Sequence, residues 1–449
     1  MADVVHRSDL LAFLQCERRL WLENRPQELA PGHLDARIVR ADEGQRIEAL
    51  AHTRYPDGVD LRGAPWDRVQ AALNDPAVRT VYGAVVHARG YKVRLDILVR
   101  TTGPWTHVDV RSGLKVKRGH LFDVSVRRSV AAAAGLSIDR SMICHMRRAS
   151  TDAPPSAERN LRVVDVTHRL TEIDLPDASS LKHARDQPEE PSIAVGEHCT
   201  GPWRCPYMSR CGAGTMAWAR PPSGAAHAVD AEHEYISDEL IDLLPSGPVY
   251  SLDFEALQTP LPVAPGIRPF EPLPFLWVAR RSDADTSHVF TSHAPDPRRA
   301  FTESLLTALQ GSHTVLVWSD YESTTLARLA RQLPDLRDAL GEFIERLVDL
   351  HALVRRGFWH PDLGGQYSVK AVAKAVCADF DYSDLAIDNG RDAALIGLGL
   401  QRGLLAERRK QDLVDYCERD VIAVQRVWQH LDAARTQRTT ERPPPAPLG

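Results

Sequence analysis

The sequence predicts an α/β protein built from two domains. Its 449 residues are too many for one ordinary hydrophobic core. The first half contains three successive strand-like stretches followed by a helix, and the second half alternates apolar strands with helices up to one long final helix. A hydrophobic content of 43% and a charged content of 26% are typical of a soluble globular chain.

In the first half, helical spacing of apolar residues comes first and strand-like alternation follows. Helices are predicted at 9–21 and 41–51. Three strands are predicted at 81–87, 91–99 and 105–110, before a further helix at 121–134. Two stretches rich in Pro, Asp, Glu and Ser, 150–160 and 184–192, predict loops. The order is therefore helix, antiparallel strands, helix.

A change in composition separates the halves. From residue 213 to 234 the chain is rich in small residues, Pro and His, which predicts a linker and a boundary near 235. The predicted domains are thus 1–234 and 235–435. The tail 436–449, which contains three consecutive prolines, is predicted to be disordered.

The second half has its own succession of strands and helices. Strands are predicted at 249–257, 274–281, 287–292 and 314–319. Helices are predicted at 301–309 and 412–433, with others between them.

Charge and hydropathy limit the possible partners. With 55 basic and 60 acidic residues the formal charge is −5, so any contact with nucleic acid must come from local basic patches. No signal-like start and no run of about 20 apolar residues occurs, which predicts a cytoplasmic protein without a membrane partner.

The strand predicted at 249–257 carries two carboxylates, Asp253 and Glu255, two residues apart. Alternation along a strand places both side chains on one face. Neighbouring like charges repel, and Asp and Glu are poor strand formers, so a structural role alone rarely selects this pair. A divalent cation would resolve the conflict, and carboxylates that hold Mg²⁺ or Mn²⁺ are suited to cutting phosphodiesters.

Further acidic candidates follow later in the chain. Tyr416 and Asp420 are four residues apart in the last helix and therefore share a face. A carboxylate there could complete a metal site, and the phenol could orient an attacking water. Between the two motifs, Glu322 or Asp320 at a predicted strand-to-helix junction offers another ligand, and we favour Glu322.

This combination resembles the DEDD exonucleases of the DnaQ-like, ribonuclease H-like group that carry Tyr in the third motif. Asp253 and Glu255 match the first motif, and Tyr416 and Asp420 match the third. The second motif departs from the family, with Glu322 in the matching run. The segment that includes Lys370 resembles the helix opening between these motifs, which implies a contact of Lys370 with nucleic acid.

The resemblance implies a ribonuclease H-like mixed sheet and 3′–5′ exonuclease activity through two Mg²⁺ or Mn²⁺ ions. Asp253, Glu255, Glu322 and Asp420 would be the ligands, with Asp253 bridging the ions.

Four of the seven cysteines form a second pattern. Cys199, Cys205 and Cys211 lie close together in sequence, and Cys16 lies in the opening helix. Four thiolates suit either an iron–sulfur cluster or zinc. The pattern resembles iron–sulfur nucleases related to AddB and to CRISPR-associated RecB-like exonucleases. That resemblance implies a 4Fe–4S cluster on these cysteines, with Zn²⁺ as the alternative, and a PD-(D/E)XK restriction-endonuclease-like domain.

Between these cysteines, Asp96 and Asp109 match the acidic positions of the PD-(D/E)XK motif, but Arg111 stands where the family has Lys. Arg keeps the charge and is a poor proton acceptor. Either Lys115 or Lys117 performs the function of the family's Lys, or the site has lost catalysis and only binds nucleic acid. We favour the loss of catalysis. In the second case, Asp96 and Asp109 could still hold one metal ion, while Arg111 and Arg127 would contact phosphate.

These observations predict a metal-dependent nuclease whose C-terminal domain cuts nucleic acid, DNA rather than RNA, while its N-terminal domain binds it. Two alternatives stay open. One makes the N-terminal site the main active site. The other is a catalytically impaired nucleic-acid-binding component that works with proteins of a repair or phage-defence system such as CRISPR.

Overall fold

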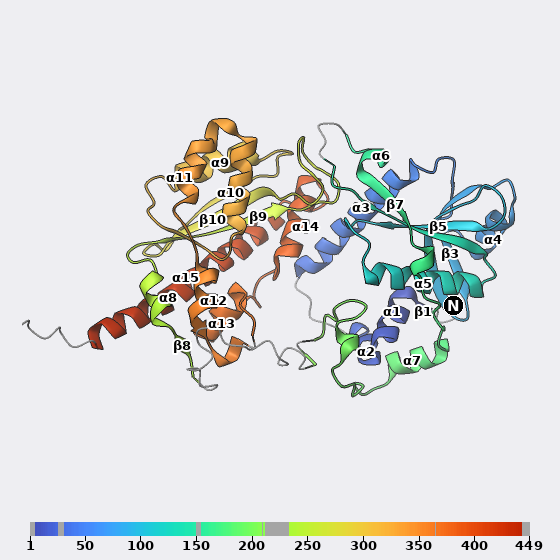
Figure 1. The fold of residues 1–449 in the computed structure, drawn as a ribbon, viewed down its shortest axis with the longest axis horizontal. Coiled ribbons are helices and arrows are strands. Elements are labelled where there is room, and N and C mark those ends of the chain that lie inside the picture. Colours follow the sequence, from blue (N-terminus) through green and yellow to red (C-terminus); the bar gives the residue numbers. More distant parts are fainter. Residues whose placement is uncertain are drawn as a thin grey trace, which may run out of the picture. The chain divides into compact units, whose positions relative to one another are not determined.

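A computed structural model describes residues 5–25, 31–149, 154–208, 210–211, 233–363 and 365–441 (Figure 1). The chain forms two compact units. One comprises 1–28, 41–213 and 259–270, and the other 29–40, 214–258 and 271–449. The boundary predicted near 235 does not anticipate the two short segments, 29–40 and 259–270, that belong to the opposite unit. Of the predicted linker at 213–234, residues 213–232 lie outside the described residues.

The N-terminal unit is built on a mixed seven-stranded sheet. Strands β2 to β7 follow one another in order, and β1 (Val5–His6) pairs with β4. The strands are β2 (Val59–Asp60), β3 (Thr80–Ala88), β4 (Tyr91–Val99), β5 (Trp105–Arg111), β6 (Ile138–Met146) and β7 (Leu161–Asp165). The three strands predicted from alternation are confirmed as β3, β4 and β5.

The helices of this unit connect the strands and cover the sheet. They are α1 (Arg7–Gln15), α2 (Glu17–Glu23), α3 (Pro31–His52), α4 (Trp66–Asn74), α5 (Arg118–Ala133), α6 (Ala157–Asn160) and α7 (Ala178–Asp186), with short 3₁₀ turns η1 (Thr167–Arg169) and η2 (Glu197–Cys199). Of α3, only residues 41–52 belong to this unit. Because β5 and β6 are parallel, α5 makes the crossover between them and packs on β3 and β4.

The predicted helix at 9–21 is not continuous. It breaks at Cys16, whose extended backbone separates α1 from α2. The backbone groups of Cys16 are nevertheless paired: its N–H donates to the Ala12 carbonyl, and its carbonyl accepts from the Leu20 N–H.

The C-terminal unit contains a mixed five-stranded sheet in the order β11-β10-β9-β12-β13, and a small pair, β14-β8. Its strands are β8 (Tyr235–Ile236), β9 (Tyr250–Leu257), β10 (Leu273–Arg281), β11 (Ser287–Thr291), β12 (Val315–Val317), β13 (Leu347–Asp349) and β14 (Phe358–Trp359). Strands β9, β12 and β13 are parallel, so their carboxyl ends meet at one edge of the sheet.

The helices of this unit cover both faces of the sheet (Figure 1). They are α8 (Asp238–Leu243), α9 (Arg298–Ala308), α10 (Tyr321–Gln332), α11 (Arg337–Ile344), α12 (Leu350–Gly357), α13 (Val369–Val376), α14 (Gly390–Gln401) and α15 (Arg409–Glu441), with 3₁₀ turns η4 (Pro334–Leu336) and η5 (Pro361–Leu363). Helix α15 continues six residues into the segment predicted to be disordered from 436; residues 442–449 lie outside the described residues.

Successive side chains of β9 point alternately to the hydrophobic core and to the opposite face of the sheet. Leu252 and Phe254 enter a cluster with residues of α9, α10 and α11, and the Phe254 ring packs edge-on against Phe301 at 5.0 Å. Asp253 and Glu255 therefore face the other side of the sheet, on which α14 and α15 pack.

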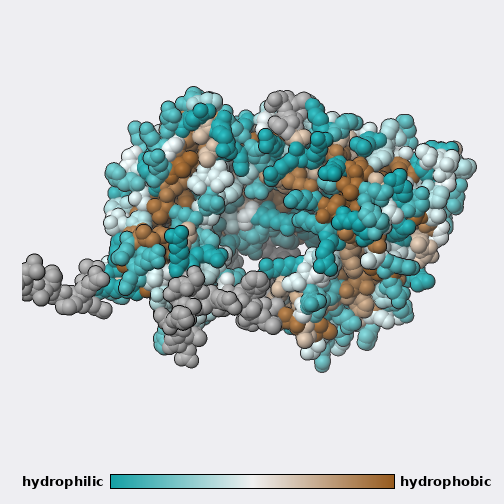
Figure 2. All heavy atoms as spheres, viewed as in Figure 1, coloured by the Kyte–Doolittle hydropathy of each residue, from teal (hydrophilic) through white to brown (hydrophobic). Residues whose placement is uncertain are grey.

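Hydrophilic side chains cover most of the visible face of both units (Figure 2). No helix among the described residues combines the length and the apolar character needed to cross a bilayer.

Candidate metal centre

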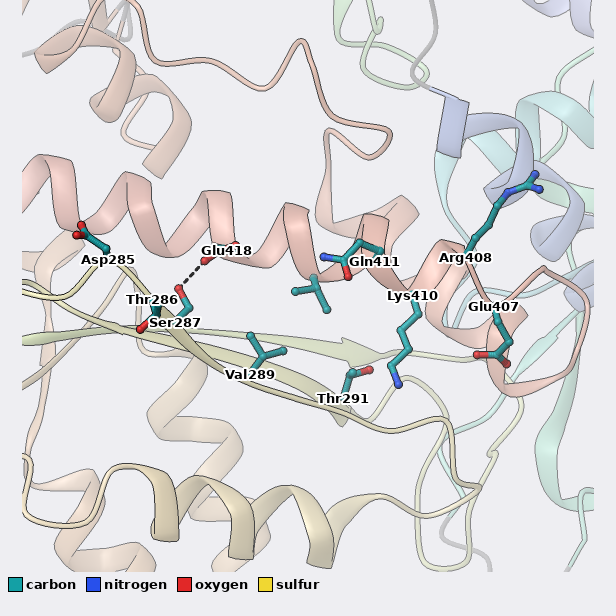
Figure 3. A pocket seen from close by; sticks show the side chains of 11 residues that line it. Asp285, Thr286, Ser287, Val289, Thr291, Glu407, Arg408, Lys410, Gln411 and Glu418 are labelled. Atoms are coloured by element: carbon teal, nitrogen blue, oxygen red, sulfur yellow. Dashed lines mark hydrogen bonds between the residues drawn. The ribbon is translucent and has the colours of Figure 1, made fainter.

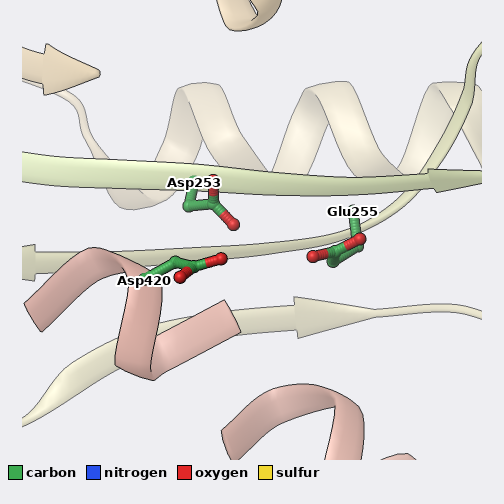
Figure 4. A group of neighbouring side chains, drawn as sticks. All are labelled: Asp253, Glu255 and Asp420. Atoms are coloured by element: carbon green, nitrogen blue, oxygen red, sulfur yellow. The ribbon is translucent and has the colours of Figure 1, made fainter. Parts of the chain in front are cut away.

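Three carboxylates converge where β9 meets α15. Ligand oxygens of Asp253, Glu255 and Asp420 all lie within 4.8 Å of one another, and Figure 4 shows the side chains turned toward a common point. Glu255 and Asp420 are buried and Asp253 is partly buried. In the described part of the chain, no other set of three or more His, Cys, Asp or Glu residues is as tight.

Glu322 lies beside this group, in the first turn of α10. It is buried, and its charge adds to burial and to the Asp420 charge in raising the pKa of both Asp253 and Glu255. Asp320, the alternative from the sequence, is exposed at the position that precedes the helix. The structure thus places Glu322, and not Asp320, among the buried carboxylates.

No described cationic side chain forms a salt bridge with the carboxylates of Asp253, Glu255, Glu322 or Asp420. Among the described residues, the buried Oε2 atom of Glu322 also has no hydrogen-bond partner. Burial and mutual repulsion raise the pKa of Asp253 and of Glu255 well above the usual range. A divalent cation held by these oxygens would remove both penalties, so the residues fit Mg²⁺ or Mn²⁺.

Two tyrosines contact the Asp420 carboxylate. The Tyr382 hydroxyl donates a 2.5 Å hydrogen bond to Oδ1, and Tyr416, one helical turn before Asp420 in α15, also interacts with it. Lys370 extends over both rings, with Nζ 4.1 Å from the Tyr382 centroid and 4.7 Å from that of Tyr416. The site therefore has one ammonium group beside its acidic centre.

Cys417 contributes a third donor. Its buried thiol lies 3.2 Å from the Asp253 Oδ2 atom and donates to it. Neither Cys417 nor Tyr382 was predicted from the sequence to belong to the site. Tyr382 lies in an irregular segment, at no characteristic sequence spacing from the motifs. Cys417 directly follows Tyr416 in the helix, and no motif predicts a function for it.

We expect metal-free protein to lose stability as the pH rises. Burial first, and then the neighbouring Asp349, raise the pKa of Glu322 from its ordinary 4.5 to about 8. A carboxyl whose pKa is higher in the folded chain stabilises the fold at low pH, and this contribution is lost as the pH rises through the folded value. Between about pH 5 and 8, the melting temperature in chelator should therefore fall.

Saturating Mg²⁺ should remove most of that fall, because the cation replaces the protons. A melting temperature in chelator that instead rises over this range would contradict the assignment of these carboxylates to one buried cluster.

The N-terminal candidate site is filled by arginines. The Nη1 atom of Arg127 lies 3.1 Å from Asp96 and 3.3 Å from Asp109, and its Nε lies 3.6 Å from Asp123. Arg111 bridges Asp109 and Asp123. These three carboxylates belong to β4, β5 and α5, so the guanidinium groups tie the helix to the sheet.

The charges in this network compensate one another. Burial would raise the pKa of Asp96, but Arg127 and Arg94 hold it well below its usual range. Burial dominates at Asp109 and raises its pKa to about 6. Asp96 and Asp109 are thus neutralised by arginine side chains and do not form an open metal site.

Two expectations from the sequence need correction here. Arg127 is buried among three carboxylates, and the partly exposed Arg111 is paired with two, so both guanidinium groups are already engaged by carboxylates of the chain. Lys115 and Lys117 are both exposed, Lys117 just before α5, and neither forms a salt bridge with Asp96 or Asp109 in the described structure.

The segment that carries Cys16 contacts the segment that carries Cys199 and Cys205. The Gln15 amide, next to Cys16, donates to the carbonyls of His198 and Trp203 at 2.8 and 2.7 Å. The Cys205 N–H donates to the Cys199 carbonyl. Burial raises the pKa of Cys205 and Cys211, and the neighbouring Cys16 and Cys199 thiols raise it further.

A separate groove of about 740 Å³ runs between β11 and the start of α15 (Figure 3). Its lining mixes acids such as Glu407 and Glu418 with bases such as Arg408 and Lys410, and Glu418 accepts a hydrogen bond from Ser287. None of the clustered carboxylates lines it, so we assign it no part in the metal centre.

A family model and a solved structure match parts of this chain. Residues 250–368 match a family model described as a domain of unknown function (DUF2779), a stretch that contains Asp253, Glu255 and Glu322 but ends before Asp420. The chain matches no curated protein. A family B DNA polymerase from the hyperthermophilic archaeon Pyrobaculum calidifontis aligns at 14% identity with a TM-score of 0.30, over 42% of this chain and 25% of the polymerase.

Proposed function

We propose that the C-terminal unit is a nuclease that hydrolyses phosphodiester bonds of nucleic acid with two Mg²⁺ or Mn²⁺ ions. The observation that carries this proposal is the convergence of Asp253, Glu255 and Asp420 within 4.8 Å, beside a fourth buried carboxylate, without a neutralising salt bridge among the described residues. In the N-terminal unit, by contrast, arginines are paired with the carboxylates of the candidate site.

Asp253, Glu255, Glu322 and Asp420 would hold the ions, which when bound activate a water and stabilise charge on the phosphate. The buried Tyr416 hydroxyl lies beside Asp420 and would orient the water for attack on phosphorus. The Lys370 ammonium would stabilise negative charge on the phosphate oxygens. Water adds to phosphorus and the bond to the leaving oxygen breaks, which yields a phosphate monoester and a hydroxyl.

The polarity of digestion rests on the resemblance to DEDD exonucleases, which act 3′–5′. DNA is the proposed substrate, and the N-terminal unit would bind it. Because Arg111 and Arg127 neutralise the N-terminal carboxylates, we do not propose a second active site there.

A substrate panel tests this function. Single and double strands of DNA and RNA, labelled at either end, are incubated with wild-type protein in Mn²⁺, Mg²⁺ or chelator. We expect metal-dependent shortening of a DNA strand from its 3′ end. Binding of the strands without cleavage in any metal would instead support a nucleic-acid-binding component.

We also propose that Cys16, Cys199, Cys205 and Cys211 hold a 4Fe–4S cluster in the N-terminal unit. The proximity of Cys16 to the distant loop 199–211 supports this assignment, because the four thiols are otherwise spread over nearly 200 residues. Such a cluster would fasten α1 and α2 to the end of the unit.

Anaerobically purified protein should therefore be brown, with broad visible absorption and about four iron atoms per chain. Cys205→Ser should lose the colour, whereas Cys377→Ser in the other unit should keep it. Colourless protein that contains one zinc ion would support the zinc alternative.

A further inference from the structure

The first turns of α3 are anchored on the C-terminal unit, although they precede it by 200 residues. The Gly32 N–H donates to the Ala386 carbonyl at 2.8 Å, and a Cβ on Gly32 would lie 2.7 Å from that oxygen, so only glycine allows this approach. Asp35 pairs with Arg409 of α15 at 2.5 Å. This part of α3 therefore has a defined position in the C-terminal unit.

Three arginines of α3 and α14 gather at this contact. Arg37 and Arg40 belong to α3, and Arg391 to the first turn of α14; all three are exposed. Burial and repulsion from Arg391 and Arg37 lower the pKa of Arg40. Arg40 lies 3.3 Å from the carboxylate of Asp392, which His33 and Asn389 also contact. Among the described residues, Asp392 thus pairs with Arg40, while Arg37 and Arg391 form no ion pair.

The cluster is next to the metal centre. A Cβ on Gly390, the residue before Arg391, would lie 3.7 Å from the Tyr416 hydroxyl. Lys370, which extends over the Tyr416 ring, donates to the Asp388 carbonyl in the same loop. A polyanion bound at the metal centre would therefore meet the arginines as it leaves the site.

An apolar strip accompanies the charges. Leu34 and Ile38, one turn apart on α3, are 58% and 55% exposed, and Arg37 shares their face of the helix. Large exposed aliphatic side chains beside unpaired guanidinium groups suit a ligand with both charged and apolar surfaces, and a nucleic acid strand offers phosphates and bases.

We propose that Arg37, Arg40 and Arg391 bind backbone phosphates of a single strand whose scissile bond lies at the carboxylate site. This inference rests on the proposed nuclease function and deepens it by naming where the substrate strand runs. The N-terminal segment 31–40 would then be part of the substrate-binding surface of the C-terminal unit.

The test uses Arg37→Ala/Arg391→Ala, because neither arginine forms an ion pair within the described residues and Arg40 supports Asp392. With a labelled oligonucleotide, KM should rise about tenfold. The slope of log affinity against log salt should fall by about 1.4, since each single-strand phosphate contact contributes about 0.7. Cleavage of the p-nitrophenyl ester of thymidine 5′-monophosphate, which lacks flanking phosphates, should be unchanged.

Arg331→Ala, an exposed arginine near the far end of α10, is the matched control and should change neither quantity. Anisotropy of a fluorescein-labelled strand, measured in the Asp253→Asn background, reads binding without turnover. An unchanged dissociation constant there would overturn this inference even if the wild type is an active nuclease. A weakened constant with an inactive wild type would overturn the proposed function and leave the binding surface standing.

Discussion

Asp253→Asn is expected to lower the rate of metal-dependent phosphodiester cleavage by about a thousandfold or more. Asn preserves the size of the side chain and can still accept the Cys417 thiol hydrogen bond, but it removes the central negative charge of the cluster. Without it, the remaining carboxylates would hold cations more weakly. Initial rates with an end-labelled strand at saturating Mn²⁺ measure the effect.

The same substitution should not destabilise the metal-free protein. It removes one of several like charges whose repulsion and burial raise the pKa of Asp253, so the melting temperature in chelator should stay constant or rise. Asp320→Asn, at the exposed position before α10, is the matched control and should keep wild-type activity. An Asp253→Asn protein that retains a tenth or more of the wild-type rate would refute the role assigned to this carboxylate.

Arg127→Ala is expected to destabilise the N-terminal unit by about 3–5 kcal/mol. The guanidinium lies between Asp96, Asp109 and Asp123, and its removal leaves buried carboxylates without their shared cation. Hydrogen exchange of peptides from β4, β5 and α5 measures the free energy of opening in this unit, independently of the C-terminal one.

Arg128→Ala is the control for that experiment. Arg128 is the next residue of α5 and is less buried than Arg127, and its one side-chain hydrogen bond within the described residues is a 3.5 Å contact with Ser141, so its loss should cost less than about 1 kcal/mol. Arg127→Ala with wild-type protection and a new metal-dependent activity would show that the arginine masks a working site instead of supporting the fold.

The sequence predicted those features that follow from local periodicity. Alternation identified β3, β4 and β5, and the two-residue and four-residue spacings placed Asp253 with Glu255 and Tyr416 with Asp420 on common faces. These predictions succeed because strand and helix geometry fixes the direction of neighbouring side chains.

Features that depend on distant packing could not be predicted in this way. Residues 31–40 join the opposite unit through the close approach of Gly32 to Ala386, for which no periodic pattern exists. The sequence shows that Arg127 is charged, but only the fold shows that carboxylates of three elements surround it. Tyr382 reaches Asp420 from an irregular segment for the same reason.

Anomalous diffraction from crystals soaked in Mn²⁺ would show whether the carboxylates of the C-terminal unit bind the metal ions. We expect two manganese peaks bounded by carboxylate oxygens of Asp253, Glu255, Glu322 and Asp420, and no peak at Asp96 and Asp109. Manganese at Asp96 and Asp109, with none at the junction of β9 and α15, would contradict this expectation.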